Sequence, residues 1–470
     1  MSGDEAGGGA AFERAAAIAP ADAAAYRAWG DALVKSFRQD EAVRVFLRGV
    51  EHAGDDAGLL LSLCYAMNVA GGATPREERE WHERLARASG LGEPATRAAD
   101  ATAPRSPRDA GTPLRVAILS ADFREHSCAF FLEKPLGAID PARVSLYLYS
   151  TTGAPDATTR RFRSLGVWRE CGTMTPDQLA AQARADAIDV LIDANAWTVP
   201  SHMPALGRRL APVQVTYLGY PATTGLNAMD RRIVDDITDP AGSDDACSER
   251  LLRVPGCFVC FGAGADWPEP RSTAYQRGEG APVFGSFNNA AKISPRVVEV
   301  WARVLRETPG ARLVLKAAGL KGAAGERLRD RFASHGIERE RLEFLAFTAT
   351  TREHVDLYSR IDVALDPFPY NGTTTTCEAL WMGVPVVTLC GDRHRARVGA
   401  SLLTAVGRGE WIAASADEYV AIATALALDS QRLQTLRKSL RAGVAGSQIC
   451  DVKAFARRFE DAVSAAWSRG

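Results

Sequence analysis

The spacing of hydrophobic residues changes along the chain, from a helical period near the N-terminus to alternating strand and helix patterns beyond it. Between residues 26 and 50 apolar positions recur at helical spacing, and small residues such as Gly30 would let two helices pack closely. The pattern partly recurs further on and is lost at Pro75. We predict a disordered tail over residues 1–20, and helical hairpins over residues 21–92 that dock on the next domain.

Beyond a Pro- and Ala-rich stretch, which we predict to be a linker at 93–112, strand and helix patterns alternate. A strand over 114–119 begins one set, and a strand over 283–287 begins a second. The other predicted strands lie at 144–149, 189–192, 213–218, 232–234, 313–315, 342–345, 363–365 and 384–389. Such alternation predicts parallel sheets with helices on both faces. We therefore predict an α/β fold with two facing Rossmann-like lobes, at 113–280 and 281–470, the second including the closing helices.

Composition and charge narrow the class of protein. The 470 residues carry 56 basic and 57 acidic side chains, whereas a nucleic-acid surface normally shows a basic excess. Apolar runs stay well short of the ~20 residues of a membrane span. The first residues lack the basic and apolar regions of a signal peptide. We expect a cytoplasmic protein without nucleic-acid or membrane partners.

Nine cysteines are scattered through the chain, and Cys257 and Cys260 have CxxC spacing. A zinc site of this kind would need a second pair or histidines at ligand spacing, and none is close in sequence. A thioredoxin-like motif would open a helix, whereas Phe258, Val259 and Phe261 predict a strand. We expect neither a metal nor a redox role for this pair.

The most distinctive polar motif follows the strand that ends at Leu365. Four consecutive threonines, Thr373–Thr376, come after an Asn-Gly turn and precede Glu378. The first-turn N–H groups of a helix lack intrahelical partners and its dipole adds positive potential, so the motif predicts an anion site. Glu378 could then take a ribose diol. The alternative is a helix that is only capped by threonine. We favour a nucleotide site, because four threonines exceed what capping needs.

Each lobe also has a polar motif directly after its first strand, where doubly wound sheets place ligands. In the first lobe, Asp122 and His126 follow the strand, and His126 could act as a base, donate to a substrate oxygen or cap the next helix. In the second lobe, Asn289 and Lys292 follow. A lysine at a helix start opposes the dipole unless an anion such as phosphate lies beside it. His354 begins another helix, where it could stack on a base or simply be exposed.

Together, these motifs resemble a known family, the O-GlcNAc transferases with the plant SPINDLY proteins. The resemblance covers about residues 113–460 and rests on the order and spacing of four motifs. They are Asp122-Phe…His126, Leu218-Gly-Tyr-Pro221-Ala-Thr-Thr-Gly225, Phe287-Asn-Asn-Ala-Ala-Lys292-Ile and Asn371-Gly-Thr-Thr-Thr-Thr-Cys-Glu378. The preceding hairpins resemble tetratricopeptide repeats, with one good copy and one degenerate copy.

The resemblance implies a GT-B fold and inverting, metal-independent transfer of a sugar from a nucleotide-sugar to Ser or Thr of a protein. His126 and Lys292 would face one cleft as the catalytic residues. By position, the resemblance assigns substrate binding to Asp122, Asn289, His354, Thr373, Thr374, Thr375 and Glu378, with Thr374 and Thr375 on the diphosphate, Glu378 at the ribose and His354 beside the base. We expect no cofactor beyond the nucleotide-sugar.

Three of these positions depart from the O-GlcNAc pattern and bear on the donor. Thr373 stands where those enzymes have His, Glu378 where they have Asp, and Asn289 where they have Gln. These choices resemble the SPINDLY branch, whose plant member transfers fucose from a guanine nucleotide. The donor is therefore UDP-GlcNAc or GDP-fucose, and the sequence leaves both open.

Two other functions remain as alternatives. One is a GT-B transferase that acts on a small molecule or glycan, although helical repeats favour a protein acceptor. The other is an inactive, repeat-containing adaptor, which the presence of both His126 and Lys292 disfavours. For the enzyme we expect no metal, because the chain has no pair of aspartates spaced i, i+2 that could hold a cation on the diphosphate.

Overall fold

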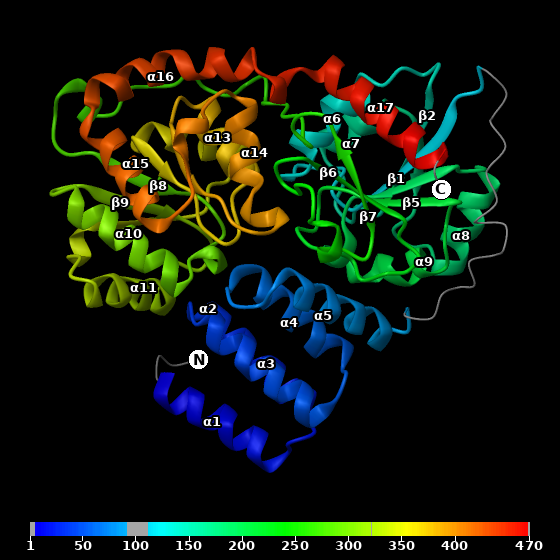
Figure 1. Cartoon of the computed structure of the whole chain (residues 1–470), viewed down its shortest axis with the longest axis horizontal. Coiled ribbons are helices and arrows are strands. Elements are labelled where there is room, and N and C mark those ends of the chain that lie inside the picture. Colours follow the sequence, from blue (N-terminus) through cyan, green and yellow to red (C-terminus); the bar gives the residue numbers. More distant parts are fainter. Residues whose placement is uncertain (1–4, 92–110, 321, 469–470) are drawn as a thin grey trace. The chain divides into compact units, whose positions relative to one another are not determined.

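The chain divides into two compact units, each with its own parallel sheet (Figure 1). The computed structural model describes residues 5–91, 111–320 and 322–468. Unit 1 consists of residues 1–73 and 263–447, and unit 2 of residues 74–262 and 448–470. Two such doubly wound sheets confirm the predicted α/β class of GT-B type.

The sheet of unit 2 has seven strands in the order β3-β2-β1-β4-β5-β6-β7, and all of its pairings are parallel. The strands are β1 (Leu114–Ser120), β2 (Val144–Ser150), β3 (Val167–Glu170), β4 (Val190–Asp193), β5 (Val213–Thr216), β6 (Arg231–Asp235) and β7 (Arg250–Val254). The helices of this unit are α5 (Pro75–Ala88), α6 (Ala129–Gly137), α7 (Ala157–Arg163), α8 (Pro176–Ala185), α9 (Met203–Gly207) and α17 (Val452–Ser468). The central strands are almost wholly buried, which explains their near-continuous apolar sequence.

The sheet of unit 1 has six strands in the order β10-β9-β8-β11-β12-β13, again with parallel pairings. The strands are β8 (Val283–Ser286), β9 (Arg312–Lys316), β10 (Leu342–Leu345), β11 (Val363–Leu365), β12 (Val386–Leu389) and β13 (Ile412–Ala413). Its helices after β8 are α10 (Pro295–Glu307), α11 (Ala323–Ser334), α12 (Thr351–Asp356), α13 (Thr374–Trp381), α14 (Val398–Ala405), α15 (Ala416–Leu428) and α16 (Ser430–Ala445). The amphipathic α10 begins at Pro295 because Ser294 caps it and proline is well suited to the first helical position.

Three short edge or near-edge strands, β3, β7 and β13, were not predicted. Residues 167–170 of β3 are half-exposed or exposed, so they lack the apolar run by which buried strands are found. The predicted strand around Cys257 is wrong, because this segment forms no ladder. Its backbone is held instead by single hydrogen bonds, from Phe258 N to Asp235 Oδ2 (2.8 Å) and from Phe261 N to Ile449 O (2.6 Å).

The N-terminal segment forms five helices, of which α1–α4 belong to unit 1 and α5 belongs to unit 2. The first four are α1 (Glu5–Ile18), α2 (Ala23–Lys35), α3 (Gln39–Ala53) and α4 (Ala57–Val69). The predicted disordered tail is wrong for Glu5–Ile18, whose alanine-rich sequence favours a helix. Close packing of α2 on α3 is confirmed, because a Cβ added at Gly30 would lie 2.2 Å from the Phe46 ring.

Buried hydrogen bonds attach these helices to the α/β parts of their units. In unit 1, Arg395 donates from Nε to Asn68 O (2.8 Å) and from Nη2 to Met67 O (2.9 Å), at the C-terminal end of α4. In unit 2, His82 Nε2 on α5 is 2.8 Å from the Tyr220 hydroxyl. Tyr220, within the Leu218–Gly225 motif of the sequence, therefore contacts α5.

The unit boundaries differ from the predicted lobes. Helix α17 belongs to unit 2, where the Phe459 ring packs 6.0 Å from that of Tyr217, although the sequence placed it with the second lobe. Helicity alone could not show on which sheet a terminal helix packs. The predicted linker lies outside the described residues except for residues 111–112.

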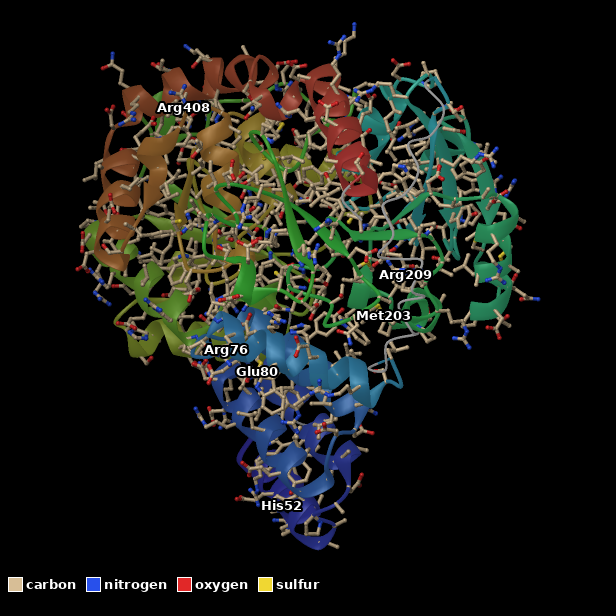
Figure 2. All side chains as sticks on the ribbon, turned by 45° about the vertical axis from the view of Figure 1, so that its right-hand side comes forward. His52, Arg76, Glu80, Met203, Arg209 and Arg408 are labelled. Carbon is tan, nitrogen blue, oxygen red and sulfur yellow. The ribbon has the colours of Figure 1, made fainter. Side chains whose placement is uncertain are left out.

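An exposed ion pair lies on the surface of α5. Arg76 and Glu80 lie one turn apart on α5 (Figure 2), where their 3.1 Å ion pair is well exposed and contributes little stability.

Within the part of the chain that the structure describes, no helix combines the length and the apolar character needed to cross a membrane.

The contact at Gly30 gives a testable prediction. Gly30→Ala should destabilise the protein by about 1–3 kcal/mol relative to Gly443→Ala, because the added methyl group overpacks against Phe46. Gly443 lies inside α16 with nothing within 4 Å of an added Cβ, so it controls for the change in helix propensity. Chemical unfolding followed by circular dichroism would measure the difference. Equal stabilities of the two variants would contradict the close packing of α2 on α3.

Candidate active site

Both sheets reverse their strand order at one point, and the predicted polar motifs lie at these points. In unit 2 the order reverses between β1 and β4, and in unit 1 between β8 and β11. The crossovers that leave such a pair of strands run in opposite directions, which opens a crevice at the carboxyl ends of the pair. Asp122 and His126 follow β1, Lys292 follows β8, and the threonine motif follows β11. Each unit thus has its candidate site where an α/β sheet binds ligands.

A buried carboxylate organises the loop that follows β11. Asp366 accepts hydrogen bonds from Gly372 N (2.6 Å) and from the Thr388 hydroxyl (2.7 Å). Burial raises the pKa of Asp366 to about 7, although these donors and Lys292 act in the opposite direction. The loop is further held by Asn371, whose Nδ2 donates to Pro367 O (3.0 Å). This loop delivers the chain to the start of α13 in a fixed orientation.

The N-terminus of α13 is not capped by a side chain. Thr373 is the N-cap residue, yet it makes no capping hydrogen bond. The hydroxyl groups that follow point elsewhere, since Thr375 donates to Asn288 Oδ1 (3.0 Å) and Thr376 donates to Gly372 O (3.0 Å). The structure therefore rules out simple threonine capping of this helix. Its first N–H groups are available for an anion.

Lys292 lies beside this helix N-terminus. Its Nζ donates to Asn371 O (2.9 Å) and lies 3.5 Å from Asn288 Oδ1, the same oxygen that Thr375 contacts. The ammonium group also lies 3.7 Å from the centre of the Tyr370 ring, within range of a cation–π interaction. Burial lowers the pKa of Lys292 to about 8, and Asp366 opposes this shift. Lys292 and the first turn of α13 thus both contact the Asn288 side chain, which brings the ammonium group close to the uncapped helix start.

A second chain of contacts lies along α12 and α13. His354 Nδ1 is 2.7 Å from Lys316 Nζ, and its Nε2 is 3.0 Å from Glu378 Oε2. The lysine ammonium can only donate and the carboxylate can only accept, so the proton of this imidazole lies on Nε2. The Tyr358 hydroxyl donates to the same Glu378 oxygen (3.1 Å). Burial lowers the pKa of Lys316, against the effect of Glu378.

In unit 2 an asparagine joins the ends of the two central strands. Asn195, after β4, donates from Nδ2 to Asp122 Oδ2 (2.7 Å) and accepts from Ala121 N (2.8 Å). Its own turn is held by Asp193, which accepts from Ala196 N (2.7 Å) and from Asn195 N (3.3 Å). Burial raises the pKa of Asp193 to about 7. Asp122 is thereby fixed with its second oxygen directed toward His126.

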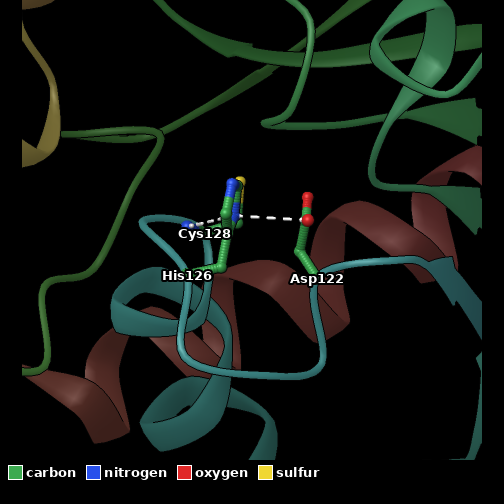
Figure 3. A group of neighbouring side chains, drawn as sticks. All are labelled: Asp122, His126 and Cys128. Carbon is green, nitrogen blue, oxygen red and sulfur yellow. Dashed lines mark hydrogen bonds and ion pairs between the residues drawn. The ribbon is translucent and has the colours of Figure 1, made fainter. Parts of the chain in front are cut away.

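His126 lies on the same loop as Asp122 (Figure 3). Its Nδ1 is 3.4 Å from Asp122 Oδ1 and 3.3 Å from the backbone nitrogen of Cys128. Burial lowers the pKa of His126, Arg124 adds to this effect and Asp122 opposes it. With a proton on Nδ1 toward Asp122, Nε2 offers a lone pair. The other tautomer accepts from Cys128 N and can donate from Nε2.

The structure groups the predicted site residues into two sets. Asp122 and His126 meet in unit 2. Unit 1 holds Asn289, Lys292, His354, Thr373, Thr374, Thr375 and Glu378. Asn289 is exposed and forms a local turn, because its Oδ1 accepts from Ala291 N (3.0 Å).

Sequence analysis missed several residues that hold the two sets in place, namely Asn195, Asn288, Lys316, Tyr358 and Asp366. Asn288 adjoins a predicted position, and Asp366 opens the threonine-rich stretch, so both could have been found from the motifs. Lys316 ends an apolar strand and Asn195 is an isolated polar residue, and neither has a motif around it.

Comparison with known proteins agrees with the geometry. The model of glycosyl transferase family 41 matches residues 98–264 and 270–459. A probable UDP-N-acetylglucosamine–peptide N-acetylglucosaminyltransferase, SPINDLY of Arabidopsis thaliana, is 40% identical over 375 residues, or 77% of this chain and 40% of that protein. The probable transferase SEC of the same plant is 30% identical over 367 residues, or 76% of this chain and 37% of that protein.

A solved structure covers more of the chain. The O-GlcNAc transferase of Thermobaculum terrenum, in a mutant form, superposes with a TM-score of 0.86 at 33% identity, over 98% of this chain and 87% of that one. The chain spans about 40% of the length of its plant relatives SPINDLY, because those proteins are longer. The fold and these matches together place the chain in glycosyl transferase family 41.

Proposed function

We propose that this chain is an inverting, metal-independent glycosyltransferase that moves a sugar from a nucleotide-sugar to Ser or Thr of proteins. The observation that carries this proposal is the uncapped N-terminus of α13 beside Lys292. An uncapped helix start and a buried ammonium group form a site for an anion such as the diphosphate of a donor. The names of the SPINDLY and SEC relatives support a peptide acceptor.

On the donor side, the residues of unit 1 bind and stabilise the leaving group. Thr374 and Thr375 lie in the first turn of α13 and present their N–H groups to the diphosphate. Lys292 neutralises the charge that develops as the bond between the anomeric carbon and the phosphate oxygen breaks. The Oε1 atom of Glu378 meets a ribose hydroxyl, since Oε2 is already engaged by His354 and Tyr358.

On the acceptor side, His126 of unit 2 acts as the base that activates the attacking hydroxyl group. The oxygen of Ser or Thr attacks the anomeric carbon from the face opposite the diphosphate, which inverts the configuration. His126 takes the hydroxyl proton at Nε2, and Asp122 orients the ring through Nδ1. Asn195 supports this arrangement by fixing the Asp122 carboxylate.

The first prediction tests the leaving-group role. Lys292→Ala should lower turnover by about 10²–10³-fold while the melting temperature stays near that of the wild type. Folding should survive because buried Asp366 can hold a proton once the lysine is absent. Lys438→Ala, at an exposed position of α16, is the matched control and should leave turnover unchanged. Near-normal turnover of Lys292→Ala would reject the role.

The second prediction concerns the pH dependence of kcat/KM, which reports groups of the free enzyme. His126 must be neutral, and its pKa is lowered, so activity should persist as pH falls and be lost only below pH 6.5. Lys292 must be protonated, so activity should fall as pH rises through about 8. Lys292→Arg, which stays charged, should move the alkaline limb upward. An unchanged alkaline limb in that variant would show that another group causes it.

The third prediction concerns the donor, UDP-GlcNAc or GDP-fucose. A site built for one base leaves polar groups unpaired with the other, so calorimetry should show at least a roughly tenfold preference, about 1.4 kcal/mol, between UDP and GDP. Thr373→His, Glu378→Asp and Asn289→Gln combined should shift that preference toward UDP. Equal affinities for the two nucleotides would defeat the idea that these three positions select the donor.

A further inference from the structure

One loop, between β1 and α6, brings a carboxylate, an imidazole and a thiol together (Figure 3). Asp122, His126 and Cys128 each place one donor atom within 4.8 Å of the other two. Within this group His126 Nδ1 lies 3.4 Å from Asp122 Oδ1. The Cys128 thiol completes the group. Three ligand types thus converge within seven residues of sequence, counting from 122 to 128.

The geometry is close to that of a zinc centre. Zinc bonds of 2.0–2.3 Å in a tetrahedron separate the ligand atoms by about 3.3–3.8 Å. His126 has 36% of its side chain exposed, so a small rotation of the ring can close the remaining gap. Mixed oxygen, nitrogen and sulfur donors suit Zn²⁺, whereas Mg²⁺ and Ca²⁺ take oxygen ligands. Three protein ligands would leave the fourth position open to water.

The neighbourhood also holds one ligand in the orientation that a metal requires. Asn195 donates to Asp122 Oδ2 (2.7 Å), which leaves Oδ1 directed at the loop. Hydrogen bonds of this kind from outside the ligand set commonly orient metal ligands. All three side chains come from one loop of unit 2, so a cation can be bound without any rearrangement of the sheet.

We infer that Asp122, His126 and Cys128 form a Zn²⁺ site through which zinc reversibly inhibits the enzyme. On binding, a sulfur–zinc bond forms and the thiol proton of Cys128 passes to solvent, with no change in oxidation state. The His126 imidazole and the Asp122 carboxylate coordinate the cation, so they can no longer act on the acceptor hydroxyl group. Zinc binding itself follows from the loop geometry, while the inhibition rests on the proposed function.

The decisive variant is Cys128→Ser. Serine keeps a hydroxyl that can donate to Asp122, but it is a poor zinc ligand, so folding and turnover should be retained. Calorimetry with ZnCl₂ should show one site per wild-type chain, and at least about tenfold weaker binding in Cys128→Ser. Cys390→Ser, which changes a part-exposed cysteine of unit 1, should bind zinc as the wild type does. Equal binding by wild type and Cys128→Ser, or no binding by wild type, would overturn the site.

Cobalt gives a second readout. Co²⁺ bound to wild type should show a sulfur-to-metal charge-transfer band that is absent in Cys128→Ser. If Cys128→Ser fails to fold, as judged by circular dichroism, His126→Gln replaces it in the binding experiment. A cobalt band of full intensity in a folded Cys128→Ser variant would exclude the thiol as a ligand.

Activity assays separate the zinc site from the proposed function. Zinc should inhibit wild-type transfer, EDTA should restore it, and EDTA alone should leave metal-free enzyme unchanged. Cys128→Ser should need at least about tenfold more zinc for the same inhibition. If zinc binds through Cys128 but does not slow transfer, the zinc site is supported. The proposed inhibition and the role of His126 in the reaction are then both rejected.

Discussion

Parallel strand pairing is the constraint on which both candidate sites depend. A parallel sheet needs a crossover for every connection, and right-handed crossovers can cover both faces only if the strand order reverses once. The reversal falls between β1 and β4 in one unit and between β8 and β11 in the other. The loops that follow the strands at those points carry the polar motifs of both candidate sites. Asp122, His126, Lys292 and the threonine motif all follow strands that border these two points.

Each of these points is stabilised by the same device, a buried aspartate at the end of a central strand. Asp193 ends β4 and accepts two backbone N–H groups of its own turn, while Asp366 follows β11 and accepts from Gly372 N and Thr388. Both side chains are almost fully buried, and this burial raises the pKa of each carboxyl group. Neither aspartate need touch a substrate. Each holds the turn from which neighbouring side chains reach the crevice.

Sequence predicted the central strands and the residues that follow them, because apolar runs and polar motifs are both local features. It predicted neither the edge strands β3, β7 and β13 nor the sheet on which α17 packs. It also missed Lys316, which reaches His354 from the end of a neighbouring strand. Contacts of that kind join residues far apart in sequence, and a single polar residue at the end of an apolar strand does not reveal its partner.

Neither unit is a continuous stretch of chain, and this affects how the protein can fold during synthesis. Unit 2 gains α17 only when residues 452–468 have been made, and α1–α4 must wait for the sheet of unit 1. Domains usually fold in order as they leave the ribosome. Here the first helices emerge long before the surface around Arg395 that covers them, and the sheet of unit 2 emerges before its final helix. A nascent chain therefore holds α1–α4 without the partners that cover them until the segment around Arg395 has been made, so their apolar faces stay exposed for longer than in a protein of two sequential domains.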